Sequence, residues 1–266
     1  MTTSKSQNYL LKLATGSGVC MSAFLLTPEP VDANICSLDN PLSINVMGCY
    51  KTPDRYVVKI LEMGLCTSNP LSGTNFEGST CTPTYTNADG VEIDVAAGAA
   101  TLTGGTSTRP ASDTYPHAYV KMANTFGLRG SYQLNSNTYC SKSDGTADAT
   151  PGCTAQNFTE TLRSFSGRCS NPYNTDDAKA SEALTEGTMS ARLTNSSYVT
   201  ATDCDATHLV GALALTNSVV IDDSTAGLEV QFTVSNSGMT IIPTNNNGNV
   251  VGQFAGGPFQ AVFSLY

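Results

Sequence analysis

The sequence contains no tryptophan, only two histidines, and charged residues at 13% of its 266 positions. Tryptophan is a favoured aromatic platform for stacking a sugar ring, so its absence weakens a carbohydrate-processing interpretation. Histidine is the usual acid or base at neutral pH, so few candidates for that role exist. The charged share is about half that of an ordinary soluble domain. The polar surface is therefore expected to consist mainly of Thr, Ser, Asn and Gly.

Clusters of Lys and Arg are also missing. The formal net charge is −9 and the isoelectric point is near 4.5. Neutralisation of phosphates by a basic face supplies most of the affinity for nucleic acid, and the same attraction draws proteins to anionic membranes. The composition therefore predicts neither nucleic acid nor an anionic membrane surface as a partner.

Long apolar runs are absent except near the N-terminus. Lys5 and Lys12 precede or begin an uncharged, mostly apolar stretch over 13–26, and a small-residue cleavage pattern ends at Ala33. This arrangement is typical of a secretory signal peptide, so we expect residues 1–33 to be a leader that is removed. A first buried helix or strand is the alternative. No other run has the length of a membrane-spanning helix, so the mature chain is expected to have none.

The cysteines form an even set once the leader is set aside. One of the nine, Cys20, lies inside the predicted leader. The other eight imply a disulfide framework and hence an oxidising, extracellular or cell-surface location, with periplasmic transit in a bacterium. Zinc is disfavoured because no two cysteines are two to four residues apart, and neither a metal nor another cofactor is predicted. The spacing predicts these pairs: Cys36 with Cys49, Cys66 with Cys81, Cys140 with Cys153, and Cys169 with Cys204.

Strand patterns dominate the rest of the sequence. Residues 56–65 are rich in β-branched and aromatic types, and 91–95 alternate after the Asp89-Gly90 turn signal. A third strand is expected over 118–126. The C-terminal third contains further short strands separated by turn-forming residues, over 209–215, 219–221, 228–234, 239–242, 250–254 and 259–266. Strands at this spacing predict an all-β fold, an antiparallel β-sandwich or a jelly-roll-like arrangement.

The middle of the chain is more polar and carries half of the eight cysteines. Residues 176–186 are the one short helix that the sequence suggests, because two Asp residues precede a stretch with Ala and Leu. We expect a single domain over 34–266, with a cysteine-rich, loop-rich insertion at about 140–205. Two β modules, 34–140 and 206–266, are the alternative.

No constellation of residues predicts catalysis. His117 and His208 both stand where a strand is expected to begin, exposed to solvent, and no G-x-S-x-G nucleophile motif occurs. The acidic pairs Glu92 with Asp94 and Asp203 with Asp205 are better explained by a wet strand face and a loop than by the two carboxylates of a glycosidase. We therefore predict that the chain is not an enzyme and has no catalytic residue, with an extracellular hydrolase as the least favoured alternative.

Two loop features stay open at this point. Asp144 and Asp148 flank a glycine turn inside a predicted disulfide loop, but the sequence lacks the closing Glu of a calcium loop, so turn formation is the favoured role. Asn157-Phe158-Thr159 and Asn195-Ser196-Ser197 match the glycosylation triplet, which matters only in a source that glycosylates.

The C-terminus suggests a role in assembly. Its last strand has alternating apolar residues and follows a glycine and proline break, so it either closes the sheet or offers an edge for strand addition between subunits. We expect a secreted or cell-surface structural protein that self-associates into a filament, layer or coat. An adhesin or a protein- or glycan-binding module is the alternative. The assembly strand comprises Phe259, Ala261, Phe263, Leu265 and Tyr266, and the aromatic residues proposed for the adhesin are Tyr139, Phe158, Phe165 and Tyr173.

Overall fold

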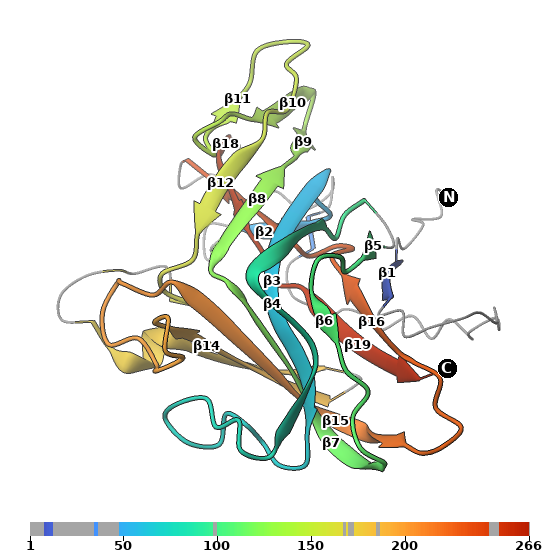
Figure 1. Cartoon of the computed structure of the whole chain (residues 1–266). Helices are drawn as coiled ribbons and strands as arrows, with labels where there is room; N and C mark the ends of the chain where they lie inside the picture. Colours follow the sequence, from blue (N-terminus) through green and yellow to red (C-terminus); the bar gives the residue numbers. More distant parts are fainter. Residues whose placement is uncertain are drawn as a thin grey trace.

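The computed structural model belongs to the all-β class (Figure 1) and describes residues 8–12, 35–36, 48–97, 100–166, 169, 173–184, 187–244 and 250–265. The elements are β1 (Asn8–Lys12), β2 (Cys49–Lys51), β3 (Arg55–Cys66), β4 (Cys81–Asp94), β5 (Ala100–Thr101), β6 (Thr106–Ser107), β7 (Asp113–Ala123), β8 (Thr125–Arg129), β9 (Ser131–Leu134), β10 (Asn137–Ser141), β11 (Ala147–Asp148), β12 (Phe158–Thr161), the 3-10 turn η1 (Thr175–Ala178), β13 (Lys179–Leu184), β14 (Gly187–Thr194), β15 (His208–Ile221), β16 (Leu228–Thr233), β17 (Met239–Pro243), β18 (Val251–Gly256) and β19 (Gln260–Leu265).

A nine-stranded sheet forms the larger layer. Its main path runs β12-β8-β3-β7-β15-β14-β13, and β4 and β6 extend it beside β3. Each strand pair of this sheet is antiparallel. Its inner face is apolar because alternate residues of the central strands, such as Ile60, Val120 and Met122, point into one buried cluster.

A four-stranded sheet, in the order β19-β16-β1-β5, forms the second layer. Val230 and Phe232 of β16 lie in the same buried cluster as the inner face of the larger sheet, so the two sheets share one core. Phe259 joins the layers, since its ring centroid lies 5.8 Å from that of Tyr56 on β3 and 5.8 Å from that of Phe232. This is the sandwich-like, antiparallel all-β fold that the sequence predicts, with β1 and β5 as a parallel exception.

Two smaller sheets form one end of the molecule. β9, β10 and β11 form one, and β2, β17 and β18 form the other. Figure 1 shows β9, β10 and β11 projecting from the body as an arm. The two sheets meet where the amide of Phe254 donates a hydrogen bond to the carbonyl of Gly145, at 2.8 Å.

The disulfides join the cysteines that the spacing paired. The bonds are Cys36–Cys49, Cys66–Cys81, Cys140–Cys153 and Cys169–Cys204. Cys66 and Cys81 also face each other across β3 and β4, so this bond closes the loop 67–80 at its base.

The helix expected over 176–186 is wrong. Only one 3-10 turn forms, capped by the Asn174 side chain, which accepts a hydrogen bond from the amide of Asp176 at 3.1 Å. The chain then enters β13, which pairs with β14 at the edge of the larger sheet. Pairing with a sheet edge outweighs the weak helix propensity of so short a segment.

One further expectation about local structure changes. Asp89-Gly90 is not a hairpin turn but lies inside β4, where Gly90 has φ of +72° and the register against β3 shifts. A glycine with positive φ within a strand is typical of a bulge. The polar middle contributes β12, β13 and β14 to the large sheet.

Candidate functional site

The four-stranded sheet carries the predicted assembly strand. β19 pairs antiparallel with β16, and the register sets Ala261 opposite Phe232 and Phe263 opposite Val230. β19 is the end strand in the order of this sheet, so among the described residues no strand pairs with its outer edge. Tyr266, the last of the predicted assembly residues, lies outside the described residues.

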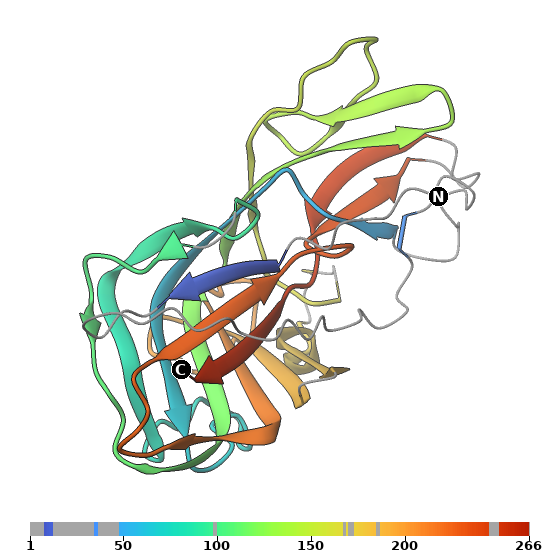
Figure 2. The same ribbon diagram turned by 90° about the vertical axis from the view of Figure 1, so that its right-hand side faces the viewer.

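On its other edge, β16 pairs with β1 (Figure 2). The register is antiparallel and sets Tyr9 opposite Phe232 and Leu11 opposite Val230. β1 falls inside the segment 1–33 that the sequence predicts to be a leader. Completion of this sheet within the chain therefore depends on residues that export is expected to remove.

The side chains of β16 that point away from the main core, here called the outer row, are polar, and in the described part of the chain each has an atom that lacks a hydrogen-bond partner. Glu229, Gln231 and Thr233 alternate with the core residues of this strand. Glu229 Oε1, Gln231 Nε2 and Thr233 Oγ1 are buried, and none of these atoms has a hydrogen-bond partner among the described residues. Buried polar groups are normally hydrogen-bonded, and each one left unpaired costs about 1–3 kcal/mol.

A second polar site lies on the outer face of the large sheet. Lys121 Nζ of β7 is 2.9 Å from Glu62 Oε1 of β3, and the two side chains are 9% and 23% exposed. The hydroxyl of Tyr119 donates a hydrogen bond to the same carboxylate oxygen at 2.7 Å. Lys121 Nζ also lies 4.3 Å from the ring centroid of Phe76 and 4.2 Å from that of Tyr198. This charge is therefore held by an anion and by aromatic faces.

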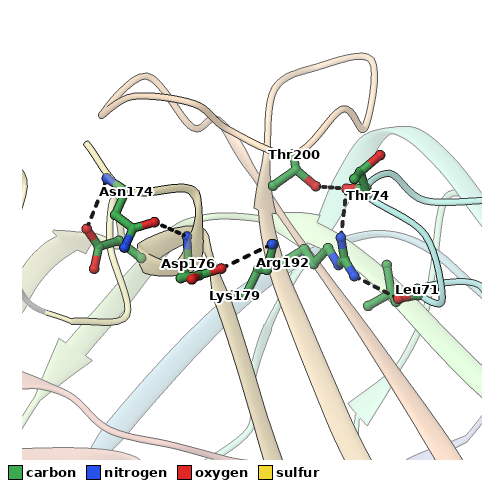
Figure 3. Close-up of polar contacts among 8 residues, drawn as sticks. Leu71, Thr74, Asn174, Asp176, Lys179, Arg192 and Thr200 are labelled. Carbon is green, nitrogen blue, oxygen red and sulfur yellow. Dashed lines mark hydrogen bonds and ion pairs between the residues drawn. The ribbon is translucent and has the colours of Figure 1, made fainter. Parts of the chain in front are cut away.

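The disulfide-closed loop 67–80 covers this cluster. The guanidinium of Arg192 on β14 donates hydrogen bonds to the carbonyls of Thr74 and Leu71, both at 2.7 Å, and the Thr200 hydroxyl also donates to Thr74 (Figure 3). These contacts place Phe76 over Lys121. The site is built to fasten a loop to the sheet.

Burial also shifts the pKa values of its aromatic neighbours. The pKa of the Tyr198 hydroxyl is raised, first by burial and then by the nearby charge of Glu62. Burial lowers the pKa of His208, whose ring packs edge-on against Tyr198 at 5.4 Å. His208 Nδ1 lies 2.8 Å from the hydroxyl of Thr207. The histidine thus packs in the cluster and is half-buried, where the sequence suggested an exposed strand start.

The four aromatic residues proposed for ligand binding divide into two groups. Tyr139 and Phe158 are buried in the main core. Phe165 and Tyr173 are half-buried, and the hydroxyl of Tyr173 donates a hydrogen bond to the carbonyl of Arg163 at 3.1 Å. Of the four, only Phe165 and Tyr173 present part of a ring to solvent.

The remaining candidate residues have local structural roles. His117 lies within β7, half-buried, and burial lowers its pKa. Asp144 accepts hydrogen bonds from the amide of Thr146 at 2.9 Å and from its hydroxyl at 2.6 Å, and Asp148 accepts one from the amide of Thr150 at 2.9 Å. Contacts of this kind, from an Asp side chain to the backbone two residues later, are typical of turns.

In each of the two acidic pairs, one carboxylate accepts hydrogen bonds from backbone amides. Asp94 Oδ1 accepts hydrogen bonds from the amides of Tyr56 and Ala96, and Asp203 accepts one from the amide of Asp205. The pKa of Asp205 is raised by its hydrogen bond with Asp203 and by burial. In the part of the chain that the structure describes, no group of three His, Cys, Asp or Glu residues is placed to hold a metal ion.

Sequence reasoning missed the Lys121 cluster and the strand β1. A signal for the first exists, because Lys121 is the one charged residue in the apolar strand expected over 118–126. Its partner Glu62 lies in the expected strand 56–65 but cannot be assigned without the register of β3 against β7. For β1, the apolar residues were assigned to a leader.

Comparison of the chain with protein-family models, with curated proteins and with solved structures finds no significant match. Within the described residues, no helix has the length and apolar character needed to cross a membrane.

Proposed function

We propose that this chain is a structural subunit of an extracellular or cell-surface assembly, and that it has no catalytic role. The four disulfides are consistent with an oxidising compartment. The observation that carries the proposal is the outer edge of β19, which has no strand partner among the described residues. An unpaired edge of alternating apolar residues is a template for pairing with another chain.

The test is the oligomeric state of the protein recovered outside the expressing cell. Light scattering after size exclusion, with negative-stain imaging, is expected to show regular multimers. Val262→Lys places a charge in the middle of β19, at the position that the register sets opposite Gln231 in the outer row, and is expected to abolish them. Val220→Lys is the control, because Val220 is 50% exposed on β15. A protein that stays monomeric at every concentration contradicts the proposal.

A second function, binding of a protein or glycan, is favoured by the projecting arm (Figure 1) and by the half-buried aromatic residues Phe165 and Tyr173. Exposed aromatic surface is well suited to recognition. If this function holds, Tyr173→Ala removes binding in a pull-down or glycan array. Tyr173→Phe is the control, because it keeps the ring and loses only the hydrogen bond to Arg163.

A further inference from the structure

Within the described residues, β1 is held in the four-stranded sheet by its pairing with two strands. It pairs with β16 along five residues, and with β5 through two. All five residues of β1 belong to the predicted leader, while β16 and β5 belong to the predicted mature chain. Removal of the leader would therefore take away β1, which closes the β16 edge, and would leave β16 and β5 in place.

In this closed state, the outer row of β16 carries polar atoms that are buried and, within the described part of the chain, unpaired. Glu229 Oε1, Gln231 Nε2 and Thr233 Oγ1 are buried without a partner among the described residues, and Thr233 is only 7% exposed. Each such atom costs free energy that water or a polar partner would restore. A rearrangement of this sheet edge that exposes the row to water, or gives it a polar partner, therefore recovers that free energy.

We propose that Asn8–Lys12 act as a removable plug, which closes the β16 edge until the leader is cut and which then gives place to β19 of a second copy. This inference rests on the proposed assembly function. It adds which two surfaces form the contact between subunits. One is the β16 edge that β1 vacates, and the other is the outer edge of β19 from a second copy.

β19 suits the place of β1 for three reasons. It is already an antiparallel partner of β16 on the opposite edge, and its own outer edge has no strand partner among the described residues. Its rows match those of β1, since Ala261 and Tyr9 both stand opposite Phe232, and Phe263 and Leu11 both stand opposite Val230. Among the described residues, β5 is the only strand paired with the other edge of β1, and that pairing covers two residues. Because the contact joins two different surfaces, it leaves a free edge at each end of a row of subunits, which grows as an open filament unless the rotation closes it into a ring.

The experiment compares one folded molecule before and after cutting. A specific protease site replaces residues 27–33 of the full chain, and the protein is purified folded and then cut. Light scattering and negative-stain imaging are expected to show assembly only after the cut leader leaves. Excess synthetic peptide of residues 6–14 is expected to refill the edge and suppress assembly at least tenfold. Binding of the same peptide carrying a dye is the second readout.

Two variant peptides test the register. Leu11→Asp puts a charge opposite Val230, so this peptide is expected to lose both binding and inhibition, whereas Leu10→Asp lies opposite Gln231 and keeps both. The Val262→Lys chain is expected to bind the peptide after cutting but not to assemble. Equal assembly before and after cutting, or equal potency of the two variant peptides, overturns the plug and leaves the assembly function standing. A cut chain that releases its leader and stays monomeric overturns both.

Discussion

Lys121 and Glu62 form an ion pair across neighbouring strands, with 2.9 Å between Nζ and Oε1, on the side of the large sheet that faces away from the main core. The pair is covered by Phe76 and Tyr198, so it is the point at which the loop 67–80 is attached to the sheet. Three predictions concern this attachment.

Lys121→Met is expected to destabilise the fold, because it leaves the partly buried Glu62 carboxylate without its cation. We expect a loss of about 2–4 kcal/mol in the free energy of unfolding by urea, somewhat below the cost for a fully buried pair. Lys179→Met is the matched control: it breaks the exposed pair with Asp176, at 3.2 Å, and is expected to change the same quantity by no more than about 0.5 kcal/mol. Equal losses in the two variants would show that Glu62 does not need Lys121.

Gly64→Ala is expected to displace the Tyr119 ring. A Cβ at Gly64 would lie 2.5 Å from the carbonyl oxygen of Thr82 and 2.6 Å from Tyr119 Cε1, closer than either contact allows. The ring must shift and weaken its hydrogen bond to Glu62, at a cost of about 1–3 kcal/mol. Near-UV circular dichroism and urea unfolding report the change. Gly73→Ala in the covering loop has nothing within 4 Å of its Cβ and is expected to leave both measurements unchanged.

Arg192→Lys is expected to loosen the loop 67–80 without unfolding the sheet. Lysine cannot reproduce the two hydrogen bonds that the guanidinium donates to Thr74 and Leu71. A loss of about 1.4 kcal/mol in local stability corresponds to a tenfold faster hydrogen exchange at the amide of Phe76, which bonds to the carbonyl of Tyr198. The control is Arg163→Lys, at an exposed side chain. Unchanged exchange at Phe76 would mean that the disulfide and the remaining contacts, such as the Thr200 hydrogen bond to Thr74, fix the loop without Arg192.

The sequence predicts the all-β class and the disulfide pairs because both depend on local signals. Alternation along the chain identifies a strand such as β16, and each cysteine pair spans one short stretch or the polar middle. Asp89-Gly90 shows the limit of such signals. The same dipeptide that makes a hairpin turn makes a bulge when both flanking segments pair with one partner strand, here β3.

The candidate sites depend on which strands become neighbours, which the sequence does not state. Lys121 and Glu62 meet only because β7 lies beside β3 in one register. Leu11 stands opposite Val230 in the register only because β1, from the opposite end of the chain, lies between β16 and β5. Tyr139 and Phe158 were attractive as exposed aromatic residues because their segment looked loop-rich, but strand pairing draws both into the core.

Glu160 makes the stability of the fold depend on pH. Glu160 lies on β12, where its carboxylate accepts a hydrogen bond from the amide of Gly256. Burial raises its pKa above the usual 4.5, and the bond to Gly256 only partly opposes this. The folded state therefore binds a proton more readily than the unfolded state does, so Glu160 costs stability at neutral pH and regains it as the pH falls through the raised value.

Replacing Glu160 with Gln is expected to remove this contribution. The difference in free energy of unfolding between the Glu160→Gln variant and the unaltered chain should be largest at pH 7, in favour of the variant, and should shrink as the pH approaches 4.5. His117 and His208 act in the opposite sense, because their lowered pKa values give stability that is lost as the pH falls below 6.5, but this effect is common to both proteins and cancels. Glu92→Gln, at an exposed position, is the control. A difference that stays constant between pH 4.5 and pH 7 would show that the Glu160 carboxyl titrates alike in the folded and unfolded chain.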